Sequence, residues 1–554
     1  METNIVTYNI EVIKESFDAN HKKTAVVQTF IANKLVSEKK YGIVTKEEIY
    51  IHLKNNEDVN LNGCYVKDFS ISEFKKGINL PASQLFDINN FEAENAFFDC
   101  SFLTDFSGIN FKGKAKFSNT IFSHGNLSFF QSRFTSNEDV EFIDTIFGNG
   151  EINFQYVEFG KLNRVLFTSS NFHGGVVSFV NANFNDGDAL FNSVNFNNCK
   201  VKFNYSKFGK GGINFQKTKF GDRSLDFRKV EFGTGRVDFR RAVFGNGYIT
   251  FDEAEMVSGK FNFRLTRFGN NDISFHSMNF GDAEVLFENV NFGTGQVSFS
   301  ECIAKSISFK GSRLDVFLDL TVKQVKEIDL SDTVLRDIID LKPANNHHVH
   351  LNTLYLYGMR NLGRIIIDWR ENNIKNLIKN QQNTTLRQKA EQFNILKENF
   401  HLGGQYEDED MAYIQFKRFE LRADYEKTLK GGGLKLLKMP NYLFRWLIFD
   451  KMGLYATSPM RVLLSVLVVY VLYSWLYLLL HFFNIGDVVN AVGATDQLTY
   501  LQTCFYHSAI TFLTVGYGDY YPMGYSRGIS IMEGWSGVFL MSYFTVAFVR
   551  KILR

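Results

Sequence analysis

GTGRVDFRRAVFG, residues 233–245, is one unit of a repeat that runs through the middle of this chain. A small or branched residue, any residue and then phenylalanine occur twice within the unit, at 237–239 and at 242–244. Such alternation over a few positions predicts two very short β-strands, each with one buried side. Glycine and asparagine after the second phenylalanine favour turns, as at Asn246-Gly247. Each unit is therefore expected to supply two strands and the turns between them.

The phenylalanines of this unit recur along the chain with a period of twelve residues. The first series is unbroken and consists of Phe167, Phe179, Phe191, Phe203, Phe215, Phe227, Phe239, Phe251, Phe263, Phe275, Phe287 and Phe299. The second lies five residues later and consists of Phe172, Phe184, Phe196, Phe208, Phe220, Phe232, Phe244, then Met256 as an interruption, and Phe268 onward. A short period repeated this often indicates a solenoid, in which each buried phenylalanine contributes roughly 1.5–3 kcal/mol.

The repeated pattern resembles the pentapeptide-repeat family, with two residues added at alternate corners. The resemblance implies a right-handed quadrilateral β-helix whose coils hold about two units each and stack about 4.8 Å apart. The period alone leaves open another winding or a hairpin meander. Some pentapeptide-repeat proteins are soluble DNA mimics that display carboxylates, whereas Arg236, Asp238, Arg240 and Arg241 interleave the two signs. A scaffold or sensor role is therefore favoured for this solenoid, expected over residues 91–369.

The composition bounds the rest of the chain. Its 554 residues predict several domains, and a formal net charge of +2 argues against a nucleic-acid partner bound through bulk positive charge. Residues 1–90 are typical of a mixed α/β cap, and the N-terminus lacks the apolar core of a signal peptide.

Because no catalytic constellation stands out, we expect neither an enzyme nor a cofactor. Five cysteines are scattered singly, which favours a reducing compartment and no zinc site: Cys64, Cys100, Cys199, Cys302 and Cys504.

Beyond the phenylalanine ladder, leucine and isoleucine extend the coils to about Trp369. Helical spacing of apolar residues then predicts a hairpin linker over 370–433, which ends in the flexible Gly431-Gly432-Gly433. Three histidines are possible metal ligands, but without cysteine or carboxylate at ligand spacing they are typical of a solvated loop: His347, His348 and His350.

Two apolar segments are long enough to span a bilayer, residues 462–483 and 528–548. At 1.5 Å per residue they reach roughly 33 and 31 Å, against a hydrocarbon core of about 30 Å. Basic residues before the first segment and after the second place both ends in the cytoplasm by the positive-inside rule. Residues 434–458 are too short and too charged to cross but aromatic enough to lie along the membrane interface; a buried linker helix fits the pattern equally well.

Between the two spans lies TFLTVGYGDYYP, residues 511–522, which follows a helix-like run at 499–512. Irregular backbone at membrane depth is tolerated only where it lines a water-filled path or is buried in protein. Two glycines around Tyr517 allow the backbone to aim successive carbonyl oxygens to one side. Four such loops around an axis would form rings of carbonyls that can replace the hydration shell of a potassium ion. The stretch therefore predicts an ion-selectivity filter.

This order of span, helix, TVGYGD and span resembles the pore module of tetrameric potassium channels in their bacterial two-transmembrane form, over residues 459–554. The resemblance implies a homotetramer in the cell membrane that conducts K+ without a cofactor, with a pore helix at 499–512. Departures from the family pattern at Tyr506-His507 and Ile510 concern filter inactivation rather than permeation. The filter residues that it implies are Thr514, Val515, Gly516, Tyr517 and Gly518, supported by Asp519 and Thr511.

Two residues of the second span have open interpretations. Gly537 is either a gating hinge, as the resemblance suggests, or a site where neighbouring helices pack closely. Glu533 is costly in lipid and is expected to face the pore helix or a neighbouring subunit.

Two alternative functions stay open at this point, a non-selective cation channel and a membrane-anchored scaffold with a vestigial pore. No arginine-studded voltage sensor precedes residue 459 in the sequence. The sequence identifies neither a gating ligand nor a protein partner, so the hypothesis that the solenoid gates the pore rests only on its attachment to the pore region.

Overall fold

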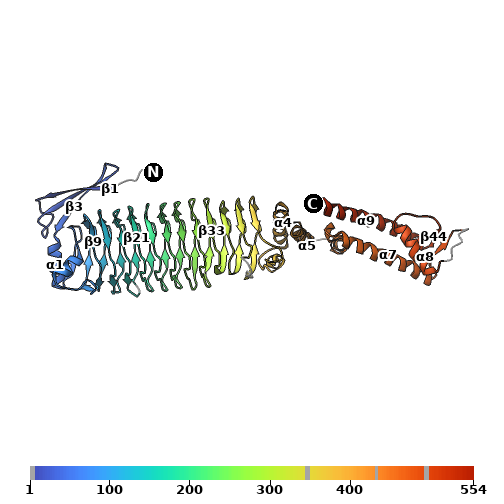
Figure 1. The fold of residues 1–554 in the computed structure, drawn as a ribbon, viewed down its shortest axis with the longest axis horizontal. Helices are drawn as coiled ribbons and strands as arrows, with labels where there is room; N and C mark the ends of the chain where they lie inside the picture. Colours follow the sequence, from blue (N-terminus) through green and yellow to red (C-terminus); the bar gives the residue numbers. More distant parts are fainter. Residues whose placement is uncertain (1–5, 162, 344–349, 431–434, 492–497, 554) are drawn as a thin grey trace. The chain divides into compact units, whose positions relative to one another are not determined.

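The computed structural model describes residues 6–161, 163–343, 350–430, 435–491 and 498–553 (Figure 1). The chain forms two compact units, Met1–Gln382 and Asn383–Arg554. The first unit is a β-solenoid of stacked parallel strands, and the second is helical with two membrane-capable helices. This confirms the predicted fold class.

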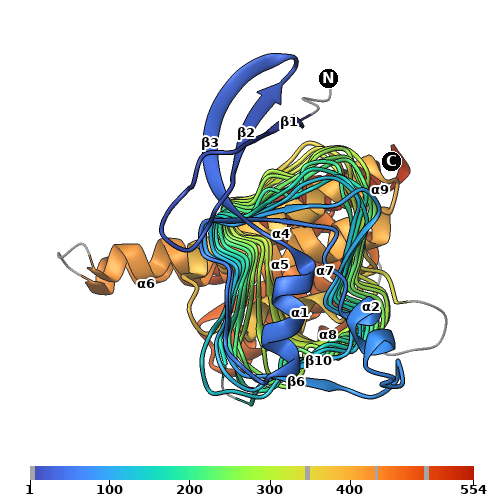
Figure 2. The same cartoon turned by 90° about the vertical axis from the view of Figure 1, so that its left-hand side faces the viewer.

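The solenoid has two long sheets of thirteen and twelve strands and shorter sheets on its other sides. Partners on adjacent coils, such as Thr168 and Asn192, are 24 residues apart. One coil therefore holds two twelve-residue units, as predicted, and Figure 2 shows the coils lying over one another. The long sheets run from β4 (Val59–Asn60) to β40 (His350–Tyr355) and from β9 (Leu103–Asp105) to β42 (Arg364–Ile366). Shorter sheets include β6 (Phe86–Ile88), β10 (Ile109–Phe111), β14 (Arg133–Phe134) and β18 (Glu158–Phe159), and β35 (Arg313–Leu314), β38 (Val334–Leu335) and β41 (Arg360–Asn361).

The twelve-residue phenylalanine series splits into two columns inside the solenoid. Phe167 stacks on Phe191 with ring centroids 4.9 Å apart, and Phe179 stacks on Phe203 at 4.7 Å. Between the columns, Phe167 meets Phe179 edge to face at 5.6 Å. Offset stacking and edge-to-face contact are the favoured arrangements of aromatic pairs, and the stacking distance matches the spacing of adjacent strands. The ladder is thus a continuous aromatic core.

Met256, the interruption in the second series, is compensated by a neighbouring phenylalanine. It is buried where a ring would otherwise lie between Phe232 and Phe280. Phe261 occupies a position that holds valine on the coils either side, and its ring lies 5.7 Å from Phe232 and 5.4 Å from Phe280. The missing aromatic volume is therefore supplied by a residue five positions later.

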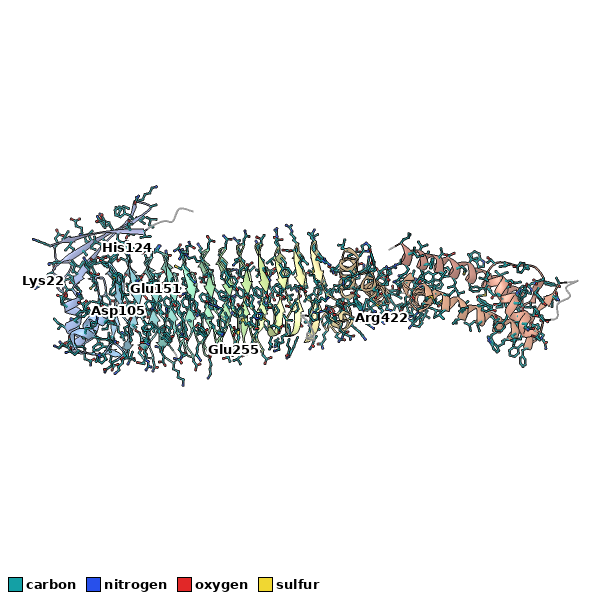
Figure 3. All side chains as sticks on the ribbon, in the orientation of Figure 1. Lys22, Asp105, His124, Glu151, Glu255 and Arg422 are labelled. Atoms are coloured by element: carbon teal, nitrogen blue, oxygen red, sulfur yellow. The ribbon has the colours of Figure 1, made fainter. Side chains whose placement is uncertain are left out.

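Mixed charges cover the outside of the coils. Glu151 and Glu255, both labelled in Figure 3, are exposed. Ion pairs link successive coils, as between Lys207 and Glu231 at 2.8 Å. These observations agree with the interleaved signs of the repeat.

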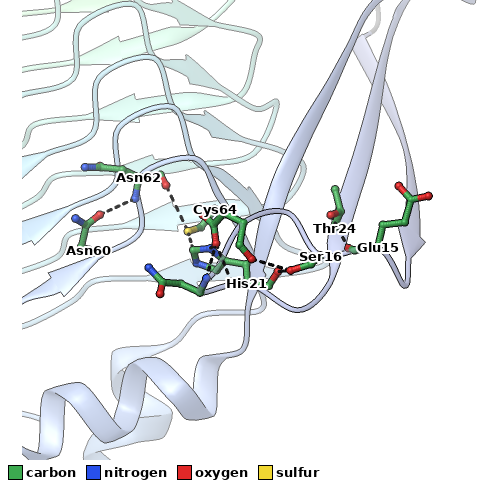
Figure 4. Close-up of polar contacts among 9 residues, drawn as sticks. Glu15, Ser16, His21, Thr24, Asn60, Asn62 and Cys64 are labelled. Atoms are coloured by element: carbon green, nitrogen blue, oxygen red, sulfur yellow. Dashed lines mark hydrogen bonds and ion pairs between the residues drawn. The ribbon is translucent and has the colours of Figure 1, made fainter.

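The N-terminal segment is continuous with the first coils. An antiparallel arm of β1 (Val6–Ile13), β2 (Thr24–Ile31) and β3 (Lys34–Val44) leads into β5 (Cys64–Lys67), which pairs in parallel with β3 and with β8 (Phe97–Asp99). At its base, His21 Nδ1 lies 2.8 Å from Asp18 and His21 Nε2 lies 3.5 Å from Cys64 Sγ (Figure 4). The two helices of the segment are α1 (Lys46–Lys54) and α2 (Ile71–Gly77). The strands of the coils thus begin at β4, before residue 91, where the sequence predicts the solenoid to start. The sequence did not indicate these first strands because they lack the phenylalanine period.

The far end of the solenoid carries a short helix, α3 (Ile374–Lys379), which contacts β40. Its apolar residues Ile374, Leu377 and Ile378 are buried. His347 and His348 lie outside the described residues, as does the side chain of His350.

The second unit begins with a helical hairpin, as the linker pattern predicts. A capping box of Thr385 and Gln388 starts α4 (Leu386–Leu402), which packs against α5 (Tyr406–Lys430) with Phe393 and Phe419 stacked at 5.5 Å. The glycines at 431–433 lie outside the described residues. The segment that follows comprises α6 (Lys435–Arg445), a π-helical turn (Trp446–Met452) and a 3-10 turn (Leu454–Ala456).

Among the described residues after 458, the structure has three helices and one small antiparallel pair of strands. α7 (Pro459–Phe482) and α9 (Ser526–Ile552) are long and apolar enough to cross a membrane, and α8 (Tyr500–Phe512) lies between them in sequence and contacts both. An antiparallel pair that the sequence analysis did not predict, β43 (Gly486–Asn490) and β44 (Tyr520–Gly524), joins the segments on either side of α8.

Candidate ion-conduction site

The TVGYG loop is suspended from the last turn of α8. A capping box of Thr499 and Gln502 fixes the start of this helix. At its other end the Val515 amide donates to the Ile510 carbonyl at 2.8 Å, and the Leu513 amide donates to the Ala509 carbonyl at 3.1 Å. Because these bonds join the loop directly to the helix, the position of the loop follows the position of the last turn of α8.

The backbone of the loop alternates in handedness. φ is positive at Thr514 (57°), Gly516 (58°) and Gly518 (82°), and the residues between them are not in this region. Such alternation of φ allows successive carbonyl groups to face the same side, which a column of oxygen ligands requires. Glycine adopts this conformation freely, whereas a β-branched threonine does so at a cost typical of functional sites.

The loop is exposed in the single chain. Residues 513–518 are all exposed, and the side chain of Tyr517 is 74% exposed. The hydroxyl of Thr514 donates to the Leu513 carbonyl at 2.7 Å, and that of Thr511 lies 3.5 Å from His507 Nε2. In the single chain the surface of this loop is therefore open to solvent.

Asp519 is held behind the loop from two directions. The hydroxyl of Tyr506 on α8 donates to its carboxylate at 2.8 Å, and the amide of Ala491, next to β43, donates to its backbone carbonyl at 2.7 Å. Tyr506 is one of the positions that departs from the family pattern. It supplies the hydroxyl that ties Asp519 to the helix.

Glu533 lies at the meeting point of three helices. It is completely buried and accepts a hydrogen bond from Tyr477 on α7 at 2.7 Å and another from Ser508 on α8. His507 is buried beside it and meets the Tyr477 ring edge to face at 5.1 Å. The carboxyl group thus faces α8, the helix that the sequence predicts to be the pore helix.

Gly537 touches the end of α8 directly. A methyl group placed on it would come within 1.9 Å of the Phe512 carbonyl oxygen. In this conformation the glycine therefore permits close helix packing, which is one of its two predicted roles; hinge motion stays a prediction.

Polar contacts that the sequence did not predict join α5 to the segment before α7 and to the C-terminal end of α9. Arg418 pairs with buried Asp450, ahead of α7, at 2.7 Å. At the C-terminal end of α9, Arg550 lies 3.2 Å from Asp410 and 4.4 Å from the ring centroid of Tyr413. The partners in each pair lie 32 and 140 residues apart in the sequence and belong to no repeat, so no sequence pattern indicates that they meet.

One comparison with known proteins finds a match in this part of the chain. Residues 465–554 match the ion channel family. No curated protein and no solved structure matches the chain. The ion channel segment covers α8, the TVGYG loop and α9, together with most of α7. With the two membrane-capable helices, the match indicates a membrane protein that passes ions.

Proposed function

We propose that this chain is a subunit of a homotetrameric, potassium-selective channel. The observation that carries the proposal is the TVGYG backbone, with φ positive at alternate residues, between two membrane-capable helices. Rings of carbonyl oxygens replace the hydration shell of K+ only when several such strands surround one axis. Since one chain supplies one strand, four copies form the filter, and the exposed face of Thr514–Gly518 is where they meet.

The charges at the helix ends give the orientation of the proposed channel. Arg445, Lys451 and Arg461 precede or begin α7, whereas Arg550 and Lys551 end α9. By the positive-inside rule both ends face the cytoplasm of a cell membrane, so the solenoid is cytoplasmic and the TVGYG loop opens outward. The partners of the chain in this proposal are membrane lipid, K+ and three further copies. It assigns the chain no catalysis and no cofactor.

Selectivity is what separates this proposal from a non-selective cation channel. The intact Gly516-Tyr517-Gly518 sequence supports selectivity, as does the bond from Tyr506 that holds the adjoining Asp519. A scaffold with a vestigial pore would need neither the alternating sign of φ in the TVGYG loop nor the bond from Tyr506 to Asp519.

A flux experiment tests the proposal. Liposomes that contain the purified protein and are loaded with K+ or Rb+ should release that ion when a protonophore lets protons enter in exchange. Liposomes loaded with Na+ instead should retain it. Native mass spectrometry should give a mass four times that of the chain. Equal release of Na+ and K+ favours the non-selective channel. Absence of both tetramer and flux favours the membrane-anchored scaffold.

A further inference from the structure

α9 and α8 meet along two matched pairs of residues. Glu533 on α9 accepts a hydrogen bond from Ser508 on α8. One helical turn further along each helix, Gly537 lies against the backbone of Phe512. Residues four apart share one face of a helix, so the two pairs form one continuous contact, the 533/537 face. Resting on the potassium-channel function proposed above, we propose that the 533/537 face of α9 positions the pore helix, and that it thereby fixes the filter geometry on which selectivity depends.

The carboxyl group provides the polar half of this contact. A buried carboxyl group is costly unless it is hydrogen-bonded, and both oxygens of Glu533 have a hydroxyl partner. Its two partners lie on different helices, Tyr477 on α7 and Ser508 on α8. One side chain therefore fixes the position of α8 relative to both membrane-capable helices.

Gly537 provides the steric half. With the Phe512 carbonyl 1.9 Å from the place of an added methyl group, any side chain at residue 537 must push α8 away from α9. Gly534 lies on the same helix, and an added methyl group there meets no atom within 4 Å. The chain thus contains a matched control, in which the same substitution leaves α8 in place.

The end of α8 transmits this position to the filter. Phe512 is followed within two residues by Thr514, and the Val515 amide is bonded to Ile510. A shift of this turn therefore moves the first carbonyl groups of the filter. Because coordination of K+ depends on ring geometry, we expect ion discrimination to change before tetramer assembly does.

The test uses full-length channels in planar bilayers, with the K+/Na+ permeability ratio taken from reversal potentials. Gly537→Ala should lower the ratio about fivefold or more, as expected for the loss of one good buried contact, while Gly534→Ala leaves it unchanged. Ser508→Ala and Tyr477→Phe, which each remove one hydroxyl group, should lower it in the same direction. Native mass spectrometry establishes that each variant still forms tetramers.

Each outcome has a defined meaning. Unchanged permeability ratios in Gly537→Ala, Ser508→Ala and Tyr477→Phe would overturn the inference, as would equal effects of Gly537→Ala and Gly534→Ala. If Gly537→Ala fails to assemble, the two hydroxyl variants decide. A wild-type channel that does not select K+ over Na+ contradicts the proposed function instead, so the two failures are distinguishable.

Discussion

At the scale of single residues, the site depends on backbone conformations that only certain residues adopt cheaply. For a residue other than glycine, left-handed backbone costs roughly 1–2 kcal/mol. This use of Gly516 and Gly518 was predictable from the residue type alone. The positive φ of Thr514 was not, because threonine rarely adopts it, and neither was the bond from Tyr506 to Asp519, which depends on tertiary structure.

Substitution of Gly516 by alanine tests this backbone requirement. An added methyl group meets no atom of the chain within 4 Å, so the change acts within one chain through backbone strain at φ 58°. We expect Gly516→Ala to reduce unitary K+ current at least about tenfold, since a strain of 1–2 kcal/mol displaces the carbonyl ligands. Gly528→Ala in α9, which also meets no atom, is the control. Normal current through Gly516→Ala channels would refute the requirement.

At the scale of elements, the exchange of Met256 and Phe261 offers a quantitative test of the solenoid core. Phe261→Val should lower the free energy of unfolding by about 1–3 kcal/mol because it leaves a cavity beside Phe232 and Phe280. Met256→Phe alone should overpack the same space. The double variant restores the regular ladder, so the two effects should be strongly non-additive. Strict additivity in denaturant melts followed by circular dichroism would show that the two side chains do not share this space.

The contact between α5 and the end of α9 makes a second prediction at this scale. Asp410→Ala leaves Arg550 without its carboxylate partner at 3.2 Å, and the Asp410 side chain is only 10% exposed. We therefore expect amide hydrogen exchange in α5 to rise about tenfold. Glu407→Ala changes an exposed acid in the same region and should have no effect. The charge swap of Asp410→Arg with Arg550→Asp should restore slow exchange; failure of the swap to do so would indicate that charge pairing does not hold α5.

Elements with a sequence period were predictable, and elements without one were not. The coils, the hairpin of α4 and α5, and both membrane-capable helices follow twelve-residue, helical or uninterrupted apolar patterns. β43 and β44 are five residues each and pair across the whole of α8, so no local signal links them. The same holds for the early coil strands at β4 and β5, which precede the phenylalanine series.

At the scale of the whole molecule, two kinds of architecture share one chain. The solenoid is stabilised by one repeated contact, so its fold follows from periodicity. The segment that matches the ion channel family relies on single residues at single places, such as Glu533 and Gly537, and its loop is exposed in the single chain. The central claim, selective K+ conduction by a tetramer, is therefore a property of the assembly rather than of one chain.

Reversal potential across a planar bilayer tests that claim most directly. With K+ on one side and an equal concentration of Na+ on the other, a K+-selective filter predicts that single-channel currents reverse at a voltage far from zero. The side that contains K+ should be negative at this voltage, because that potential opposes the outflow of K+. Channels that reverse at zero under these conditions would contradict the account.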